Sequence, residues 1–335
     1  MAKVRTVLGD IAPSDLGVTN AHEHLLIRNG LILRKEPDFR LDSVEQAISE
    51  VQDFQKFGGQ SLVDTAPIAI GRDPEGLIAI SRATQAHIIA CTGFHKSDYY
   101  LDSHWRFHYP AEKIASLLVE EIEQGMDRWS YDGPHIERSS ARAGVIKVAT
   151  GYQVIHREAR VVFEAAAIAH RATGAPVLTH TEMGTMALEQ VKLLDSWGVK
   201  PTSLVLSHVD RNPDWAVHRD VAQTGAFMEY DGAGRVKYYP ESTLVELIRK
   251  MFDASLGDRI LLGGDTARRS YWKAYGGGPG LAYLLEHFVP RLRREGFGND
   301  EIDQMLVANP ARAFAFKESL AGVEQAARSA AVESS

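Results

Sequence analysis

A pair of histidines near the N-terminus is the first pattern in this sequence that could support chemistry. His22 and His24 lie in the run Val-Thr-Asn-Ala-His-Glu-His-Leu, residues 18–25, which predicts a β-strand with a polar end. Because side chains alternate between the two faces of a strand, both imidazoles point the same way. Neutral imidazole is a common ligand of zinc-like ions. The pair indicates one face of a metal site, with two hydrogen-bonded structural histidines as the alternative.

Four further polar residues end other strand-like runs: Lys147, His180, His208 and Asp265. If these runs are strands of one barrel, their C-terminal ends meet at the barrel mouth, where barrel enzymes place their chemistry. Histidines, a lysine and a carboxylate at one mouth predict a metal-dependent active site. Asp265 is the best candidate to take a proton and pass it to a leaving oxygen. A purely structural ligand is the alternative role for this aspartate.

Lys147 is unusual because it interrupts the apolar run Val-Ile-Lys-Val-Ala. A buried charged lysine is costly, so the side chain needs an opposing carboxylate or must lose its charge. A neutral amine can react with carbon dioxide to give a carbamate, which is a carboxylate able to bridge two metal ions. A lysine that extends along the surface to reach solvent is the remaining alternative.

The elements that must position these residues alternate between strand and helix. Helical patterns cover residues 43–57, 111–125, 157–172 and 185–197. The eight strand-like runs are 18–25, 61–64, 86–93, 143–150, 176–180, 203–208, 226–231 and 259–265. Continuous apolar runs separated by helices predict a parallel sheet, and eight of them predict an α/β fold of the (β/α)8 TIM-barrel type. We expect one domain over residues 1–317 and a fraying tail over residues 318–335, which is rich in Ala, Ser and Glu.

Composition limits the classes of function. The net charge of −7 and the pI near 6.0 provide no general basic surface, so we expect no nucleic-acid partner. A single cysteine, Cys91, excludes an intrachain disulfide and fits a reducing compartment; its apolar strand predicts an inert thiol. The N-terminus lacks an apolar signal segment, and no apolar run is long enough to span a membrane. We therefore expect a cytoplasmic protein without a membrane partner.

Taken together, these stretches resemble the phosphotriesterase family of the amidohydrolase superfamily. The resemblance covers about residues 5–317 and is carried by Thr6-Val-Leu-Gly, His22-x-His24, Lys147, Leu178-Thr-His180-Thr, Leu206-Ser-His208 and Gly264-Asp265-Thr. It implies a binuclear metal centre. One divalent ion would be held by His22, His24 and Asp265, and the other by His180 and His208. Carboxylated Lys147 and a hydroxide that attacks the substrate would bridge the two ions. Zinc fits these ligands, and manganese or cobalt would also fit.

Two loops carry the information about substrate. Residues 231–240 and 265–278 follow the seventh and eighth predicted strands, where barrel enzymes frequently bind phosphate. The five basic residues of these loops are Arg235, Lys237, Arg268, Arg269 and Lys273. Arginine suits phosphate because its planar fork donates hydrogen bonds in pairs. A solvated loop surface is the alternative explanation for any one of them.

The same loops resemble the branch of the family that opens phosphorylated sugar lactones. In that branch a lysine, an arginine and a tyrosine hold the phosphate, and they map onto Lys237, Arg268 and Tyr271. The resemblance implies a lactonase for a furanose lactone 5-phosphate. A broad lactonase or esterase with promiscuous organophosphate (phosphotriesterase) activity is the alternative within the class, and a non-catalytic binding barrel is the alternative outside it. Relatives are often homodimers, so a homodimer is also expected.

Some segments carry no assignment at this stage. Residues 126–142 look longer than the family's usual approach to the fourth strand, and they either reshape the mouth or decorate the surface. Residues 94–100 are expected to line the pocket, with contacts that the sequence does not define. His104 and His108 have ligand-like spacing, but their aromatic neighbours favour packing over a second metal site.

Overall fold

The computed structural model describes residues 2–319 of the 335-residue chain. Eight parallel strands form one sheet and follow each other in chain order. They are β3 (Thr19–Glu23), β4 (Ser61–Asp64), β5 (His87–Gly93), β6 (Val145–Ala149), β7 (Val177–His180), β8 (Leu204–Ser207), β9 (Phe227–Tyr230) and β10 (Ile260–Leu262). The backbone N–H of Asp265 donates to the carbonyl oxygen of His22 at 2.8 Å, which joins the end of β10 to β3. The sheet is therefore a closed barrel, and the predicted (β/α)8 fold is confirmed.

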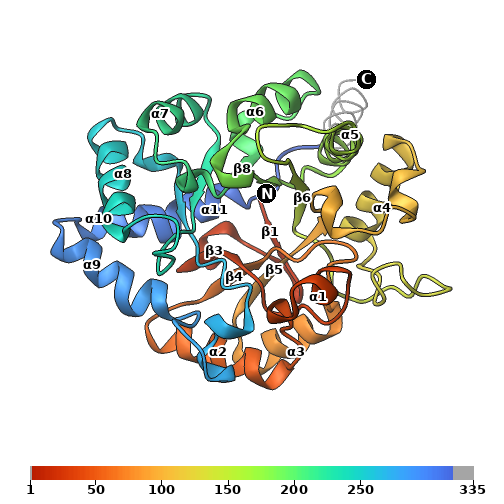
Figure 1. Cartoon of the computed structure of the whole chain (residues 1–335), viewed down its shortest axis with the longest axis horizontal. Helices are drawn as coiled ribbons and strands as arrows, with labels where there is room; N and C mark the ends of the chain where they lie inside the picture. The colour runs from red at the N-terminus through yellow and green to blue at the C-terminus, as the bar shows by residue number, and fades with distance from the viewer. Residues whose placement is uncertain (1, 320–335) are drawn as a thin grey trace, which may run out of the picture.

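The longer helices surround the strands on the outside of the barrel (Figure 1). The α-helices in chain order are α1 (Ile32–Lys35), α2 (Val44–Lys56), α3 (Pro74–Thr84), α4 (Ala111–Glu123), α5 (Arg157–Thr173), α6 (Ala187–Ser196), α7 (Trp215–Gln223), α8 (Glu241–Asp253), α9 (Val289–Arg294), α10 (Asn299–Asp303) and α11 (Asn309–Ala313). The four predicted helices correspond to α2, α4, α5 and α6. The α6 helix begins two residues later than expected because a short 3-10 turn over Glu182–Gly184 precedes it.

A two-stranded antiparallel hairpin precedes the barrel and was not predicted. It pairs β1 (Val4–Thr6) with β2 (Gly9–Ile11), and the family-like stretch Thr6-Val-Leu-Gly forms its turn. Strands of three residues are too short to produce a readable alternation of apolar and polar side chains. Val4 packs with the side chains inside the barrel, so the hairpin covers the barrel end opposite the predicted mouth.

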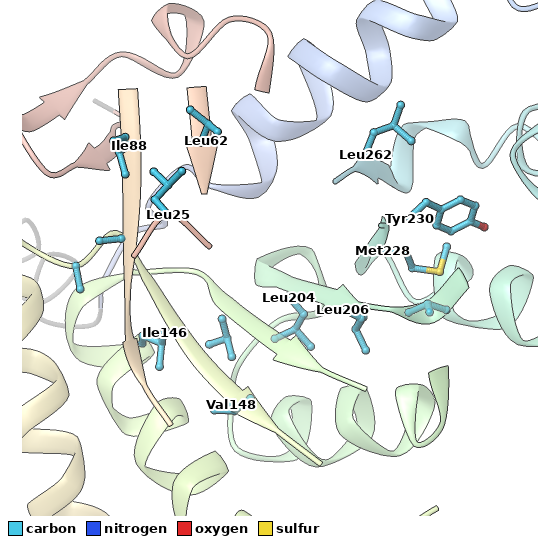
Figure 2. Close-up of a cluster of buried hydrophobic side chains, with 14 of the residues drawn as sticks. Leu25, Leu62, Ile88, Ile146, Val148, Leu204, Leu206, Met228, Tyr230 and Leu262 are labelled. Atoms are coloured by element: carbon cyan, nitrogen blue, oxygen red, sulfur yellow. The ribbon is translucent and has the colours of Figure 1, made fainter. Parts of the chain in front are cut away.

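The barrel strands place alternate side chains inside the barrel and against the helices. Figure 2 shows part of the outward layer, including Leu62, Ile146 and Leu206. The inward layer contains Val145, Leu178 and Phe227 among other buried side chains. Residues two positions further along each strand share this inward direction and lie closer to the mouth: Lys147, His180 and Glu229.

The single domain over residues 1–317 stays a prediction. One barrel with its helices accounts for residues 19–313. The predicted tail, from residue 320 onward, lies outside the described residues. Within the described part of the chain, every helix is too short or too polar to cross a membrane.

Candidate metal centre

The predicted metal ligands meet at the C-terminal ends of the barrel strands. The imidazole rings of His22 and His24 are 5.7 Å apart between centroids, and those of His22 and His208 are 4.9 Å apart. The His180 ring lies 4.6 Å from the His208 ring. Asp265 Oδ1 lies 3.4 Å from His24 Nε2 and 3.8 Å from His22 Nε2. The structure therefore brings together all five predicted histidine and aspartate ligands.

Lys147 lines the same pocket from β6 and is only 1% exposed. The alternative in which its side chain reaches bulk solvent is therefore wrong. Burial lowers the pKa of Lys147, while the nearby carboxylates of Glu229 and Asp265 act in the opposite direction. Gly93 on the neighbouring strand permits the close approach at this point, because a Cβ there would overlap the Lys147 carbonyl oxygen. The strand context thus holds an amine of reduced basicity at the barrel mouth.

Two buried carboxylates fix the orientation of two of the histidines. His22 Nδ1 lies 2.7 Å from Glu229 Oε2, and His208 Nδ1 lies 2.7 Å from Asp231 Oδ2. Burial lowers the pKa of His22 and of His208 well below the ordinary value, so both rings are neutral. A neutral ring with its proton on Nδ1 donates to the carboxylate and leaves Nε2 available for a metal ion. Carboxylate–histidine pairs of this kind orient histidines that bind metals.

His180 is oriented in the opposite sense. Its Nε2 lies 3.1 Å from Glu182 Oε2, which leaves Nδ1 for a metal ion. Burial lowers the pKa of His180 to about 4, so this ring is also neutral. The hydrogen bond to His180 lowers the pKa of Glu182 to about 2, and Lys96 adds to the effect through an ion pair. Three of the four histidines thus have one ring nitrogen beside a carboxylate, which leaves the other nitrogen available for a metal ion.

These residues fit a divalent metal ion. The ligand atoms of His22, His24 and Asp265 all lie within 4.8 Å of one another. His22, His208 and Asp231 form a second group of the same size, but Asp231 already accepts hydrogen bonds from His208, so we assign it an orienting role. His208 and Asp265 adopt left-handed backbone conformations with φ of +65° and +47°. Such strain in residues other than glycine is typical of functional sites.

Two arginines at the mouth were not predicted as part of the metal site. Arg211 and Arg235 each place a guanidinium nitrogen 2.6 Å from Asp265 Oδ2. Burial alone would raise the pKa of Asp265, but Arg235 and the neighbouring imidazoles lower it well below the usual range. Asp265 is therefore ionised, which is the state required of a metal ligand or a proton acceptor.

The sequence matches the Phosphotriesterase family over residues 2–314. The chain belongs to the phosphotriesterase family. This membership, with the ligand set above, makes it a metal-dependent hydrolase that acts on ester bonds.

Named relatives and solved structures extend over nearly the whole chain. A phospho-furanose lactonase from Mycoplasmopsis agalactiae is 39% identical, covering 94% of this chain and 92% of the relative. The crystal structure of an amidohydrolase from Mycoplasma synoviae has a TM-score of 0.92 and 39% identity, covering 95% of this chain and 93% of the other. A lactonase structure from Listeria monocytogenes has a TM-score of 0.88 and 36% identity, covering 94% and 100%.

The predicted metal ligands share one pocket with basic loop residues. This pocket has a volume of about 240 Å³ and is lined by Lys237 and Arg268 as well as by the predicted metal ligands. Lys237 Nζ donates to Tyr271 Oη at 3.0 Å. Tyr271 itself lines an adjoining pocket, together with Lys237 and Arg235. Of the three residues predicted to hold phosphate, Lys237 and Arg268 therefore line the metal pocket. Tyr271 does not line it but contacts Lys237 from the adjoining pocket.

Acidic residues surround Arg268. Its guanidinium lies 3.1 Å from Glu36 Oε2 and 3.7 Å from Asp38 Oδ2, and it stacks over the Phe39 ring at 4.3 Å. The other two basic residues of the eighth loop point away from the metal pocket. Arg269 pairs with Asp42, and Lys273 pairs with Asp53 and Glu286 on the surface. For Arg269 and Lys273, the solvated-surface alternative holds.

The structure also defines the segments that the sequence left unassigned. His95, Lys96 and Tyr99 of the 94–100 loop line the metal pocket. The 126–142 segment is pinned by the Asp127 carboxylate, which accepts from three backbone N–H groups within the segment, and it lies beside a separate surface pocket. His104 packs against Trp105 at 5.0 Å between ring centroids. The potential ligand groups in the described residues include neither His104 nor His108.

Proposed function

We propose that this protein is a lactonase that opens a furanose lactone carrying a 5-phosphate. The observation that carries the proposal is one pocket of about 240 Å³ lined both by the predicted metal ligands and by Lys237 and Arg268. A small pocket that joins a hydrolytic centre to two cations fits a compact substrate with an ester at one end and a phosphate at the other. The similarity to a protein named phospho-furanose lactonase supports the same substrate class.

We further propose that the centre binds two divalent ions, with zinc as the best fit and manganese or cobalt as alternatives. His22, His24 and Asp265 would hold one ion and His180 with His208 the other. Lys147, carboxylated by carbon dioxide, would be shared between them. Two such ions, when bound, make hydroxide available at neutral pH and polarise the ester carbonyl. The reduced basicity of the buried Lys147 amine supports the carbamate, because only a neutral amine reacts with carbon dioxide.

The residues of the chain have separate roles in this reaction. Water adds to the lactone carbonyl carbon, the ring C–O bond breaks, and one proton must move to the departing ring oxygen. Asp265 accepts the proton from the attacking water and passes it to the ring oxygen, because its carboxylate is ionised and lies among the proposed ligands. Arg211 and Arg235 hold Asp265 in place through its Oδ2 atom, while Oδ1 faces His24. The buried carboxylates Glu229 and Asp231 keep the histidines in the ligating orientation.

The phosphate would be held at the rim of the pocket. Lys237 is already positioned by Tyr271, and the Arg268 guanidinium is flattened against Phe39. Arg268 exchanges its contacts with Glu36 and Asp38 for the phosphate oxygens, which accept paired hydrogen bonds from the guanidinium. The cationic lining weighs against the alternative, a broad lactonase or esterase with organophosphate activity. Uncharged phosphotriesters gain little from Lys96, Arg211, Arg235, Lys237 and Arg268, all of which line the pocket.

The first test compares paired lactones with and without a 5-phosphate, using metal-loaded enzyme and a pH indicator for the acid released. We expect a large preference for the phosphorylated lactone and complete loss of activity with a chelator. Arg268→Met should raise KM for the phosphorylated lactone about 10- to 100-fold and change KM for the other little. Arg269→Met is the matched control, because the neighbouring arginine pairs with Asp42 away from the metal pocket. Equal effects of Arg268→Met on both lactones would refute the phosphate assignment.

The proposal also covers the partners of the enzyme, its compartment and its oligomeric state. A small-molecule substrate accounts for the pocket, and the net charge of −7 supports the absence of a nucleic-acid partner. We propose a cytoplasmic homodimer, on the basis of the single buried cysteine and the resemblance to dimeric relatives. Sedimentation equilibrium of the purified protein at micromolar concentration tests the dimer, and a mass of one chain would refute it.

A further inference from the structure

We propose that Lys96 and Glu182 bind the ring hydroxyls of the substrate and make the enzyme selective for hydroxylated lactones. This inference rests on the proposed lactonase function and adds a second recognition point to it. Neither residue was among the predicted site residues. Both line the metal pocket, together with Lys237 and Arg268.

The topology places this pair across the mouth from the proposed phosphate site. Lys96 follows β5, the third barrel strand, and Glu182 follows β7, the fifth. Lys237 and Arg268 follow β9 and β10, the seventh and eighth strands. In a closed barrel with strands in chain order, these two sets face each other across the metal ligands. A lactone held by its phosphate on one side would present its ring toward the opposite side.

The pair has unused hydrogen-bonding capacity. Lys96 Nζ donates to Glu182 Oε2, and His180 Nε2 contacts the same oxygen at 3.1 Å. Both contacts use one carboxylate oxygen. Among residues 2–319 no hydrogen bond reaches Oε1, and the ammonium group has further hydrogens to donate. The side chains are 22% and 24% exposed, so they are largely desolvated and still reach the pocket. A furanose lactone 5-phosphate carries hydroxyls at C2 and C3, each of which both donates and accepts.

Neighbouring rings hold Lys96 in position. Its backbone N–H donates to His95 Nδ1 at 2.9 Å, and its ammonium lies 5.8 Å from the centre of the Tyr99 ring. The His95 ring packs on Tyr99 at 4.0 Å and on the His180 ring at 4.7 Å between centroids. The amine is therefore presented from a packed cluster, which reduces the ordering needed when a substrate binds.

A purely structural role makes a different prediction. If Lys96 only fixed Glu182 against His180, its removal would weaken the reaction of every lactone to the same degree. If the pair binds hydroxyls, a ligand without hydroxyls leaves the remaining N–H donors of Lys96 and Oε1 of Glu182 desolvated and without a hydrogen-bond partner, although the ion pair itself persists. A site built to bond a hydroxyl rejects the analogue that lacks it far more strongly than an apolar pocket does. The ratio of rates between hydroxylated and deoxygenated lactones separates the two roles.

The experiment uses the full-length metal-loaded enzyme and three lactones: a 2,3-dihydroxy furanose lactone 5-phosphate, its 2,3-dideoxy analogue with the phosphate, and the dihydroxy lactone without phosphate. For the wild type, kcat/KM should be at least about 100-fold higher for the first than for the second. Lys96→Met should reduce that ratio about 10- to 100-fold, mostly through the dihydroxy substrate. Lys96→Arg, which keeps the charge, should retain part of the preference. Arg268→Met is the control, because it should lower the preference for phosphate and leave the hydroxyl ratio unchanged.

Binding provides a readout independent of turnover. The ring-opened dihydroxy acid 5-phosphate and its dideoxy counterpart are titrated calorimetrically into wild type and Lys96→Met, and metal content is checked for both proteins. We expect the wild type to prefer the dihydroxy acid and Lys96→Met to lose that preference while keeping its metal. A wild type that treats the dihydroxy and dideoxy lactones alike, or equal losses on both in Lys96→Met, overturns the inference alone. Failure of the wild type to hydrolyse any of the three lactones overturns the proposed function instead.

Discussion

Replacing Glu229 by Gln should weaken metal binding while leaving the fold intact. Glu229 is fully buried, and its Oε2 lies 2.7 Å from Nδ1 of His22. Burial raises the pKa of Glu229 well above that of an ordinary carboxyl, so a neutral amide of the same shape should be tolerated when no metal is bound. A metal on His22 Nε2 makes the Nδ1–H more acidic and favours an ionised acceptor behind it. Glutamine cannot provide that charge, and its amide group can also hold the wrong tautomer of His22.

The expected magnitude follows from the position of this hydrogen bond. Loss of an outer-shell carboxylate behind a metal-binding histidine costs about 10- to 100-fold in metal affinity, or about 1.4–2.7 kcal/mol. The free energy of unfolding of the metal-free protein should change by less than about 1 kcal/mol, because the amide preserves volume and one acceptor. The effect should therefore appear in the metal dissociation constant and be nearly absent from a urea denaturation curve.

Competition with a chromophoric chelator measures the affinity, and urea denaturation of the metal-free protein measures the stability. Glu50→Gln is the matched control, because Glu50 is also buried but accepts from the backbone N–H groups of Ala274 and Leu281, away from the metal pocket. Glu50→Gln should lower stability without changing the metal dissociation constant. An unchanged metal affinity in Glu229→Gln, or equal loss of affinity in both variants, would refute the orienting role.

Substitutions at three other sites test separate parts of the structure. Lys147→Glu, which supplies a carboxylate without carbon dioxide, should retain more metal by elemental analysis than Lys147→Met; equal contents would argue against a carboxylated lysine. Burial lowers the pKa of His218 to about 4, so the stability it contributes is present above pH 6.5 and is lost as pH falls toward 4, by up to about 1.4 kcal/mol per unit. Urea titrations of metal-free His218→Gln should show a correspondingly shallower dependence over that range, and an unchanged slope would contradict this. Arg72→Met should lower the free energy of unfolding by about 3–5 kcal/mol, because it leaves the Glu121 carboxylate buried without its ion-pair partner. Adding Glu121→Leu should restore much of that stability in urea denaturation. If it restores none, the loss comes from packing and not from the charge.

The sequence was sufficient for the barrel and for the cluster of histidine, lysine and aspartate side chains at its mouth. Buried parallel strands are nearly continuous apolar runs, and the helices between them have apolar residues at helical spacing. Both patterns can therefore be recognised in the sequence. Polar residues stood out because they interrupted an otherwise apolar run, as Lys147 does, or ended one, as His180 does. Alternation along the strand then predicts which way these side chains point. Lys147 shares its face with Val145, and His180 shares its face with Leu178, two buried residues that fill the barrel.

The carboxylates behind the histidines were within reach of the same reasoning but were missed. Glu229 and Asp231 alternate in the seventh strand, and Glu229 shares the inward face with Phe227. Buried acids at that spacing in a strand are a signal for an orienting role. The loop contacts were not predictable in this way. Arg211 reaching Asp265 and Lys96 reaching Glu182 depend on how irregular segments fold over the mouth, and loops carry no periodicity from which such pairs can be read.

The residues that the sequence predicts well and those that it does not have different proposed roles in the site. Residues proposed to orient or bind the metals, such as His22, Lys147 and Glu229, sit on strands whose register is fixed by a packed barrel on both faces. Residues proposed to choose the substrate, such as Lys96 and Arg268, sit on loops and are partly exposed. Substitutions on the strands should therefore weaken every reaction of the centre together, through the metal. Substitutions on the loops should change the ratio between substrates while metal content stays constant. The same barrel can for this reason keep its hydrolytic centre while the loops alone determine which ester reaches it.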